Sequence, residues 1–194
     1  LHDLPSVRLY PYQRRAVAFL RERDGCAALF MGMGTGKTRV ALAYLANLDP
    51  APKLVLVVCP LSAIGVWRNE IRKLKIGWRV IRLSQGPVKN RARLLAHLEQ
   101  QDRTSAILVN YAAFWRSPLK EVIIRLEPDT VIADEAHRLK GRSTRQSRFA
   151  QQLATRDWLK RRLALTGSPV DEGIEGLFSV YKFIDPTVFG SVWS

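Results

Sequence analysis

The stretch Met31-Gly-Met-Gly-Thr-Gly-Lys37-Thr38 lies between a short apolar run, residues 26–30, and a helical pattern over residues 39–46. A strand, a glycine-rich loop and a helix in this order are typical of a phosphate-binding loop. The glycines let successive backbone N–H groups converge on one point, and the N-terminus of the helix adds partial positive charge there. We therefore expect Lys37 to reach the β- and γ-phosphates and the Thr38 hydroxyl to hold Mg²⁺.

One position of this loop departs from the usual pattern. Met31 stands where the first glycine is commonly found, although Gly32, Gly34 and Gly36 still make the loop flexible. The alternative interpretation is a glycine-rich turn that binds nothing. The strand before it and the helix after it favour the phosphate-binding loop.

Length and composition predict one domain. The chain has 194 residues, of which 47% are apolar, and this suits a single globular domain over residues 1–194. No run has the length of a membrane span and the N-terminus does not resemble a signal peptide. We expect an intracellular protein with no membrane partner, either cytoplasmic or nucleoid-associated, or nuclear in a eukaryote. Cys26 and Cys59 lie in apolar runs and are predicted to be reduced, buried thiols.

Charge points to a polyanionic partner. The chain has 31 Lys and Arg residues against 17 Asp and Glu residues, a formal net charge of +14. Such an excess favours nucleic acid. The alternative is that an acidic portion elsewhere balances the charge.

Apolar runs and helical patterns alternate along the whole chain. The runs at residues 26–30, 54–59, 78–83, 106–109, 130–133 and 162–165 predict strands, and the segments between them predict helices. We expect one of these helices over residues 88–100, with Leu94, Leu95 and Leu98 facing inward. The alternation predicts an α/β fold, a parallel sheet with helices on both faces.

A second cluster of polar residues follows the fifth predicted strand. In Asp134-Glu-Ala-His137, Asp134 is placed to bind Mg²⁺ and Glu135 to orient or deprotonate the attacking water. The alternative is an ordinary acidic strand end, but the phosphate-binding loop upstream favours a nucleoside triphosphatase. We expect His137 to relay between the γ-phosphate site and the loop Leu165-Thr-Gly-Ser-Pro169, where Thr166 could hydrogen-bond His137 or the carboxylates. The alternative for that loop is a plain Gly-Pro turn.

Together these motifs resemble helicase superfamily two. Their order, with Tyr12-Gln13 upstream, is that of the superfamily, and Thr166-Gly-Ser-Pro169 together with the tail 177–191 resembles the first motor lobe of the Swi/Snf DNA translocases. The resemblance implies a RecA-like lobe that binds ATP and Mg²⁺ and tracks along double-stranded DNA. It implies that Gln13 reads adenine and that Thr166, Gly167 and Ser168 couple the site to motion. The residues expected to bind ATP are Gln13, Met33, Gly34, Thr35, Gly36, Lys37, Thr38 and Arg39, and those expected to be catalytic are Lys37, Asp134, Glu135 and His137.

The DNA track is predicted from charge and from segments that resemble the stretches of this family that face the DNA backbone. Nine Lys or Arg residues and one acid, Asp157, lie from Arg138 to Arg162, and such charges contact phosphates rather than read bases. The alternative is a basic face that contacts only water. We expect Trp67 and Trp158 to be packing residues, and Tyr111 to be the aromatic that a ligand could reach. The residues expected to contact DNA are Ser62, Asn110, Tyr111, Arg138, Lys140 and Arg142.

The family's second lobe, which carries an arginine finger, has no match in these residues. A site of this kind closes between two lobes, so we expect nucleotide binding with slow turnover and a second RecA-like lobe in the parent protein. The alternatives are a strand-separating helicase, a restriction-type motor, or a nucleotide-gated clamp that binds nucleic acid without hydrolysis. Intact Lys37, Asp134 and Glu135 argue against the clamp, which needs no water-activating acid.

Overall fold

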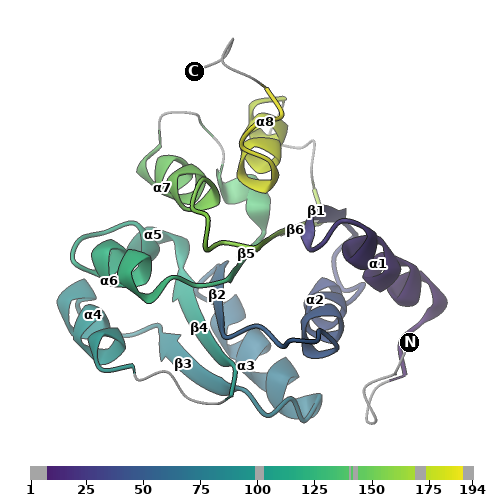
Figure 1. Cartoon of the computed structure of the whole chain (residues 1–194), viewed down its shortest axis with the longest axis horizontal. Helices are drawn as coiled ribbons and strands as arrows, with labels where there is room; N and C mark the ends of the chain where they lie inside the picture. Colours follow the sequence, from purple (N-terminus) through teal and green to yellow (C-terminus); the bar gives the residue numbers. More distant parts are fainter. Residues whose placement is uncertain (1–7, 99–102, 140, 142–143, 169–173, 190–194) are drawn as a thin grey trace.

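A six-stranded parallel sheet forms the centre of the molecule, in the order β1-β6-β5-β2-β4-β3 (Figure 1). The computed structural model describes residues 8–98, 103–139, 141, 144–168 and 174–189. The strands are β1 Cys26–Phe30, β2 Leu54–Cys59, β3 Arg79–Leu83, β4 Ser105–Asn110, β5 Thr130–Asp134 and β6 Arg161–Thr166. All six correspond to predicted apolar runs.

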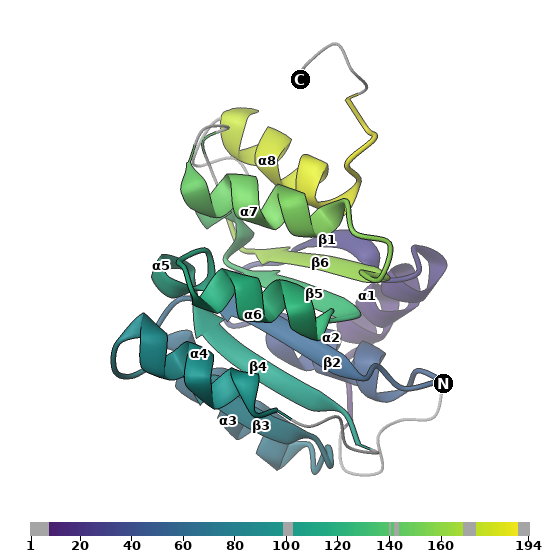
Figure 2. The same ribbon diagram turned by 60° about the vertical axis from the view of Figure 1, so that its left-hand side comes forward.

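Helices cover both faces of the sheet, so the fold has three layers (Figure 2). One face packs against α1 Pro11–Glu22, α2 Lys37–Ala46 and α3 Ala63–Lys73. The other packs against α4 Val88–Ala96, α5 Tyr111–Phe114, α6 Leu119–Leu126, the 3-10 helix η1 Ala136–Leu139, α7 Arg145–Ala154 and α8 Ile174–Ile184. Because both faces are covered, β2 is buried along its whole length, as expected for a parallel strand.

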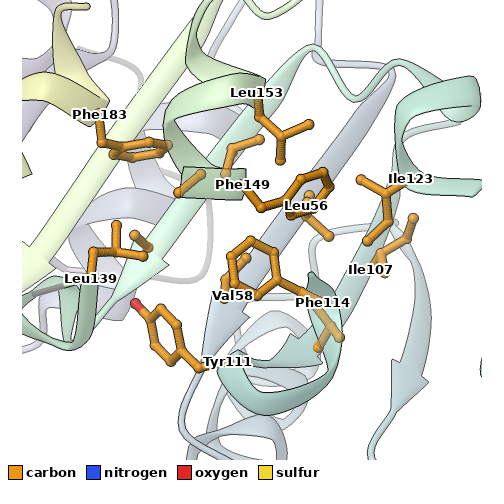
Figure 3. Packing of buried hydrophobic residues seen from close by; sticks show 14 of the residues in the cluster. Leu56, Val58, Ile107, Tyr111, Phe114, Ile123, Leu139, Phe149, Leu153 and Phe183 are labelled. Carbon is orange, nitrogen blue, oxygen red and sulfur yellow. The ribbon is translucent and has the colours of Figure 1, made fainter. Parts of the chain in front are cut away.

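Alternate residues of each strand enter opposite cores. In β2, Leu56 and Val58 belong to the cluster beneath α4 to α8, whereas Val55 and Val57 belong to the cluster beneath α1 to α3. Figure 3 shows the first cluster, in which aromatic rings such as Phe114 from the helices meet the strand residues. The period of two in the strands thus divides the apolar residues between two cores.

The structure corrects one predicted core residue. Leu94 is 58% exposed, whereas Ala92 and Leu95, three positions apart on α4, face the sheet. Residues at this spacing share a helix face, and Leu94 lies outside it. The helix ends at Ala96, earlier than the predicted residue 100, and residues 99–102 lie outside the described part of the chain. The short helices α5 and η1 were not expected.

Parallel pairing brings the ends of three strands together. Phe30 of β1 is in register with Thr166 of β6, and Leu165 of β6 is in register with Asp134 of β5. The Met31 N–H donates to the Thr166 carbonyl oxygen at 3.1 Å, which extends the pairing into the glycine loop. The segments after β1, β5 and β6 therefore leave the sheet at one edge. Within the described residues, no helix has the length and apolar character needed to cross a membrane.

Candidate functional site

The glycine loop adopts a conformation that depends on glycine at two positions. Gly34 and Gly36 have φ angles of 74° and 85°, in the left-handed region, which costs other residues free energy. Gly36 directly precedes α2, whose first residues are Lys37 and Thr38. The Thr35 hydroxyl donates to the Gly32 carbonyl oxygen at 2.7 Å and braces the turn. The loop thus reaches the N-terminus of a helix, where unpaired N–H groups favour an anion.

Lys37 lies inside the loop rather than on the surface. Its side chain is largely buried, and its Nζ donates to the carbonyl oxygens of Met31 at 2.9 Å and Gly32 at 3.2 Å. Gly167, after β6, approaches so closely that a Cβ atom there would lie 3.4 Å from Lys37 Nζ and from the Met31 carbonyl oxygen. The predicted coupling loop and the glycine loop are therefore in direct contact. Met33 is 87% exposed at the tip.

Gln13 is buried against the glycine loop. Its Nε2 donates to the Thr35 carbonyl oxygen at 2.9 Å, and its Oε1 accepts from the Tyr10 N–H at 3.0 Å. A Cβ atom on Gly36 would lie 2.6 Å from Gln13 Nε2. Tyr12, whose hydroxyl also donates to the Thr35 carbonyl oxygen at 3.2 Å, adds a second contact that was not predicted. That Gln13 reads adenine stays a prediction.

Asp134 is buried at the end of β5, and two donors hold its carboxylate. Its Oδ2 accepts from Trp67 Nε1 at 2.8 Å, and its Oδ1 accepts from the Glu135 N–H at 3.1 Å. Burial raises the pKa of Asp134, and the hydrogen bond from Trp67 opposes that rise. Trp67 was predicted only as a packing residue. A fully buried indole N–H needs an acceptor, but the sequence does not show which one.

Glu135 and His137 form a short polar chain with the loop after β6. Glu135 has a φ of 54°, a strained conformation of the kind found at functional sites. His137 Nδ1 lies 3.0 Å from Thr166 Oγ1 and 3.4 Å from Glu135 Oε2. Thr166 Oγ1 also accepts from the Ser168 N–H at 3.3 Å. Of the two partners considered for Thr166, His137 and the carboxylates, the structure has His137. Pro169 lies outside the described residues.

The predicted DNA contacts divide into three groups. Ser62 and Arg138 are exposed, and half-buried Asn110 accepts from Arg91 Nη1 at 3.0 Å. Tyr111 is buried, and its hydroxyl donates to the Asp134 carbonyl oxygen at 2.8 Å. The expectation that a ligand could reach its ring is therefore wrong, because α5 begins at Tyr111 and turns the ring into the core (Figure 3). Lys140 and Arg142 lie outside the described residues.

Arg39, expected to bind ATP, has a protein partner. Its Nε donates to Glu70 Oε1 at 2.7 Å, which ties the start of α2 to α3. Because the Arg39 side chain is 35% exposed, the ion pair does not bury it. An ATP contact for Arg39 stays a prediction.

We predict that Gly36→Ala weakens nucleotide binding by at least about tenfold. Alanine at this φ is strained by about 1–2 kcal/mol, and its Cβ would lie 2.6 Å from Gln13 Nε2, so the loop must change shape. Titration with a fluorescent ATP analogue measures the effect. Gly65→Ala is the control, because a Cβ there has no atom within 4 Å. Equal affinities of the two variants would contradict the role given to Gly36.

We predict that the two thiols differ sharply in reactivity. Burial, reinforced by the charge of Asp134, raises the pKa of Cys59 to about 12, so roughly one molecule in ten thousand carries the thiolate at pH 8. Cys26 is only partly buried. A disulfide reagent should label Cys26 in the native chain and Cys59 only after denaturation. Native Cys26→Ser protein should show no fast labelling, and fast labelling there would contradict the buried environment of Cys59.

Comparison with known proteins places this geometry in a family. The sequence-family model of the SNF2-related domain matches residues 12–194 of this chain. The DNA excision repair protein ERCC-6-like of Bos taurus is 32% identical over 186 residues, which are 91% of this chain and 14% of that protein. The DNA repair and recombination protein RAD54-like of Drosophila persimilis is 28% identical over 207 residues, covering 97% of this chain and 26% of that protein.

Solved structures agree with the sequence comparison. The Sulfolobus solfataricus SWI2/SNF2 ATPase core domain matches with a TM-score of 0.76 and 26% identity, over 95% of this chain and 36% of that one. The same core in complex with dsDNA matches with a TM-score of 0.73 and 26% identity, over 96% and 37%. These matches confirm the RecA-like α/β fold, and this chain spans well under half of each of these relatives and structures. The chain belongs to the SNF2-related domain family.

Proposed function

We propose that this chain is the ATP-binding lobe of a DNA-dependent ATPase that translocates along double-stranded DNA. The observation that carries the proposal is the contact between the glycine loop, the loop after β6 and the acids after β5. Gly167 lies against Lys37 and Met31, and Thr166 joins His137 and through it Glu135. A triphosphate at the N-terminus of α2 would thus lie beside groups suited to water activation and to reporting on the γ-phosphate.

The residues present fit a magnesium ion. Asp134 Oδ1 and Oδ2 each accept one hydrogen bond from the protein, and a carboxylate oxygen has a further lone pair for a cation or its bound water. Thr38, in the first turn of α2, would be the second protein ligand. When bound, Mg²⁺ neutralises charge on the β- and γ-phosphates.

Each remaining polar residue has a distinct role in hydrolysis. Lys37 would exchange the carbonyl oxygens of Met31 and Gly32 for phosphate oxygens and stabilise their charge. Glu135 would orient the attacking water and take its proton. His137, between Glu135 and Thr166, would transmit the state of the γ-phosphate to the loop after β6. Gln13, already against the glycine loop, would contact the adenine.

Double-stranded DNA is the proposed track, and a second lobe is the proposed partner. The net charge of +14 suits a polyanion, and the similar Sulfolobus core is in complex with dsDNA. This chain covers 37% of that solved chain, and we propose that a second RecA-like lobe in the parent protein supplies an arginine that would stabilise transition-state charge. Because these two relatives are named as DNA repair proteins, we propose an intracellular location for this protein, in the nucleus if it comes from a eukaryote.

We expect this chain to bind Mg-ATP but to hydrolyse it very slowly, with or without duplex DNA at low salt.

In the protein that also carries the second lobe, Glu135→Gln should lower turnover by roughly 10²–10⁴-fold and leave ATP binding intact. Phosphate release and nucleotide titration measure the two effects. Glu22→Gln, at the exposed end of α1, is the matched control. Turnover that survives in Glu135→Gln would show that Glu135 does not orient the attacking water. For the first prediction, brisk turnover by this chain alone would show that it supplies its own arginine finger.

We expect an Arg138/Lys140/Arg142 triple alanine variant to bind duplex DNA with a shallower salt dependence. The logarithm of the DNA-binding constant falls as the logarithm of salt concentration rises, and each lost phosphate contact reduces the steepness of that fall by about 0.9. A triple alanine variant at Arg14, Arg15 and Arg21, exposed on α1 on the other face of the sheet, removes the same charge as a control. An unchanged slope in the first variant would exclude these residues from the track.

A further inference from the structure

Two aromatic side chains hold Asp134 from separate parts of the chain. Trp67 on α3 is fully buried and donates its indole N–H to Asp134 Oδ2 at 2.8 Å. Tyr111, the first residue of α5, is buried and donates its hydroxyl to the main-chain carbonyl oxygen of Asp134 at 2.8 Å. The first contact fixes the carboxylate and the second fixes the backbone that carries it. Both donors are far from Asp134 in sequence.

These contacts restrict the carboxylate strongly. A hydrogen bond to a charged acceptor in a buried site is among the stronger ones in proteins. Trp67 occupies one side of Oδ2, and the Glu135 N–H occupies one side of Oδ1. The remaining lone pairs of Asp134 therefore point in set directions. Without the indole N–H, the side chain would have more freedom to rotate about its bond to the main chain.

Both donors lie in helices that follow the carboxyl ends of strands, close to residues that are exposed or half-buried. Trp67 is in the helix that follows β2 and the segment 60–62, in which Leu61 is 55% exposed and Ser62 is exposed. Tyr111 directly follows half-buried Asn110 at the end of β4. β2 lies between β4 and β5 in the sheet. A molecule bound across the ends of β2 and β4 would thus touch segments that hold Asp134 only a few residues later.

We propose that Trp67 and Tyr111 are positioning residues that connect the nucleic-acid-facing ends of β2 and β4 to the Asp134 carboxylate. This inference rests on the proposed function. DNA held at Ser62 and Asn110 would restrain α3 and α5, and their aromatic side chains would then restrain the carboxylate that binds Mg²⁺. The coupling is reciprocal, because any effect of DNA on Mg-nucleotide affinity equals the effect of Mg-nucleotide on DNA affinity.

The first test compares nucleotide affinity with Mg²⁺ and with a chelator, by titration of this chain with a fluorescent ADP analogue. The ratio of the two dissociation constants is the gain due to Mg²⁺. In Trp67→Phe this gain should fall by about tenfold, because the donor to the charged carboxylate is lost, while affinity in chelator changes little. Trp158→Phe removes an indole N–H from a partly buried tryptophan elsewhere in the core and should keep the full gain.

Tyr111→Phe is a second variant that disturbs the packing less than Trp67→Phe, because it deletes only one oxygen atom. Its Mg²⁺ gain should fall by a few-fold, less than in Trp67→Phe, because the lost donor holds the main chain. Tyr44→Phe is its control, since that buried hydroxyl lies beside Gly25, away from Asp134. Melting curves of all four variants establish that they fold. A wild-type gain that Trp67→Phe and Tyr111→Phe both retain would overturn this inference alone.

The second test measures the connection to DNA. The readout is the factor by which a short duplex changes Mg-nucleotide affinity at low salt. That factor should move toward one in Trp67→Phe and Tyr111→Phe and stay at the wild-type value in the two controls. An unchanged factor in both variants would overturn the proposed link. A wild-type chain that shows no Mg²⁺ gain at all would overturn the proposed function and this inference with it.

Discussion

The site depends on the main-chain pairing of β1, β6 and β5. Parallel strands direct their carboxyl ends to one edge, and the register sets Phe30 beside Thr166 and Leu165 beside Asp134. Because the pairing uses backbone groups, it places the glycine loop, the acids and the threonine loop together whatever their side chains are. A shift of one residue in either ladder would turn alternate side chains to the other face and separate these groups.

Burial gives the site its electrostatic character and also imposes a cost. Removing Asp134 from water raises its pKa, and the Trp67 indole, Lys37 and the Glu135 N–H act against that rise. An ionised carboxylate at this depth therefore needs these donors. The same low-polarity surroundings strengthen each hydrogen bond to Asp134. Trp67 and Tyr111 thus pack in the two cores and also hydrogen-bond Asp134, Trp67 at its carboxylate and Tyr111 at its main-chain carbonyl oxygen.

Two features at this edge conflict with local preference. Glu135 has a left-handed backbone, and the Lys37 ammonium is buried against carbonyl oxygens. Each costs free energy by itself, and such costs are typical of functional sites. Left-handed backbones also occur at Asp24, Lys75 and Glu127 in turns elsewhere, whereas the apolar residues of the strands are divided regularly between the two cores. The regular sheet thereby holds the strained segment after β5 in place.

The sequence by itself determined the six strands, the glycine loop and the acids, because each follows from local periodicity or from a motif at a strand end. It narrowed the partner of Thr166 to His137 or the carboxylates, and the structure has His137. The sequence failed at Leu94, whose helix phase depends on which side meets the sheet, and at Tyr111, which a short unpredicted helix turns inward. Only the tertiary structure decided that Trp67 and Tyr111 hold Asp134 and that Glu70 pairs with Arg39. The physical reason is that hydrogen-bond partners brought together by strand order leave no periodic signal along the chain.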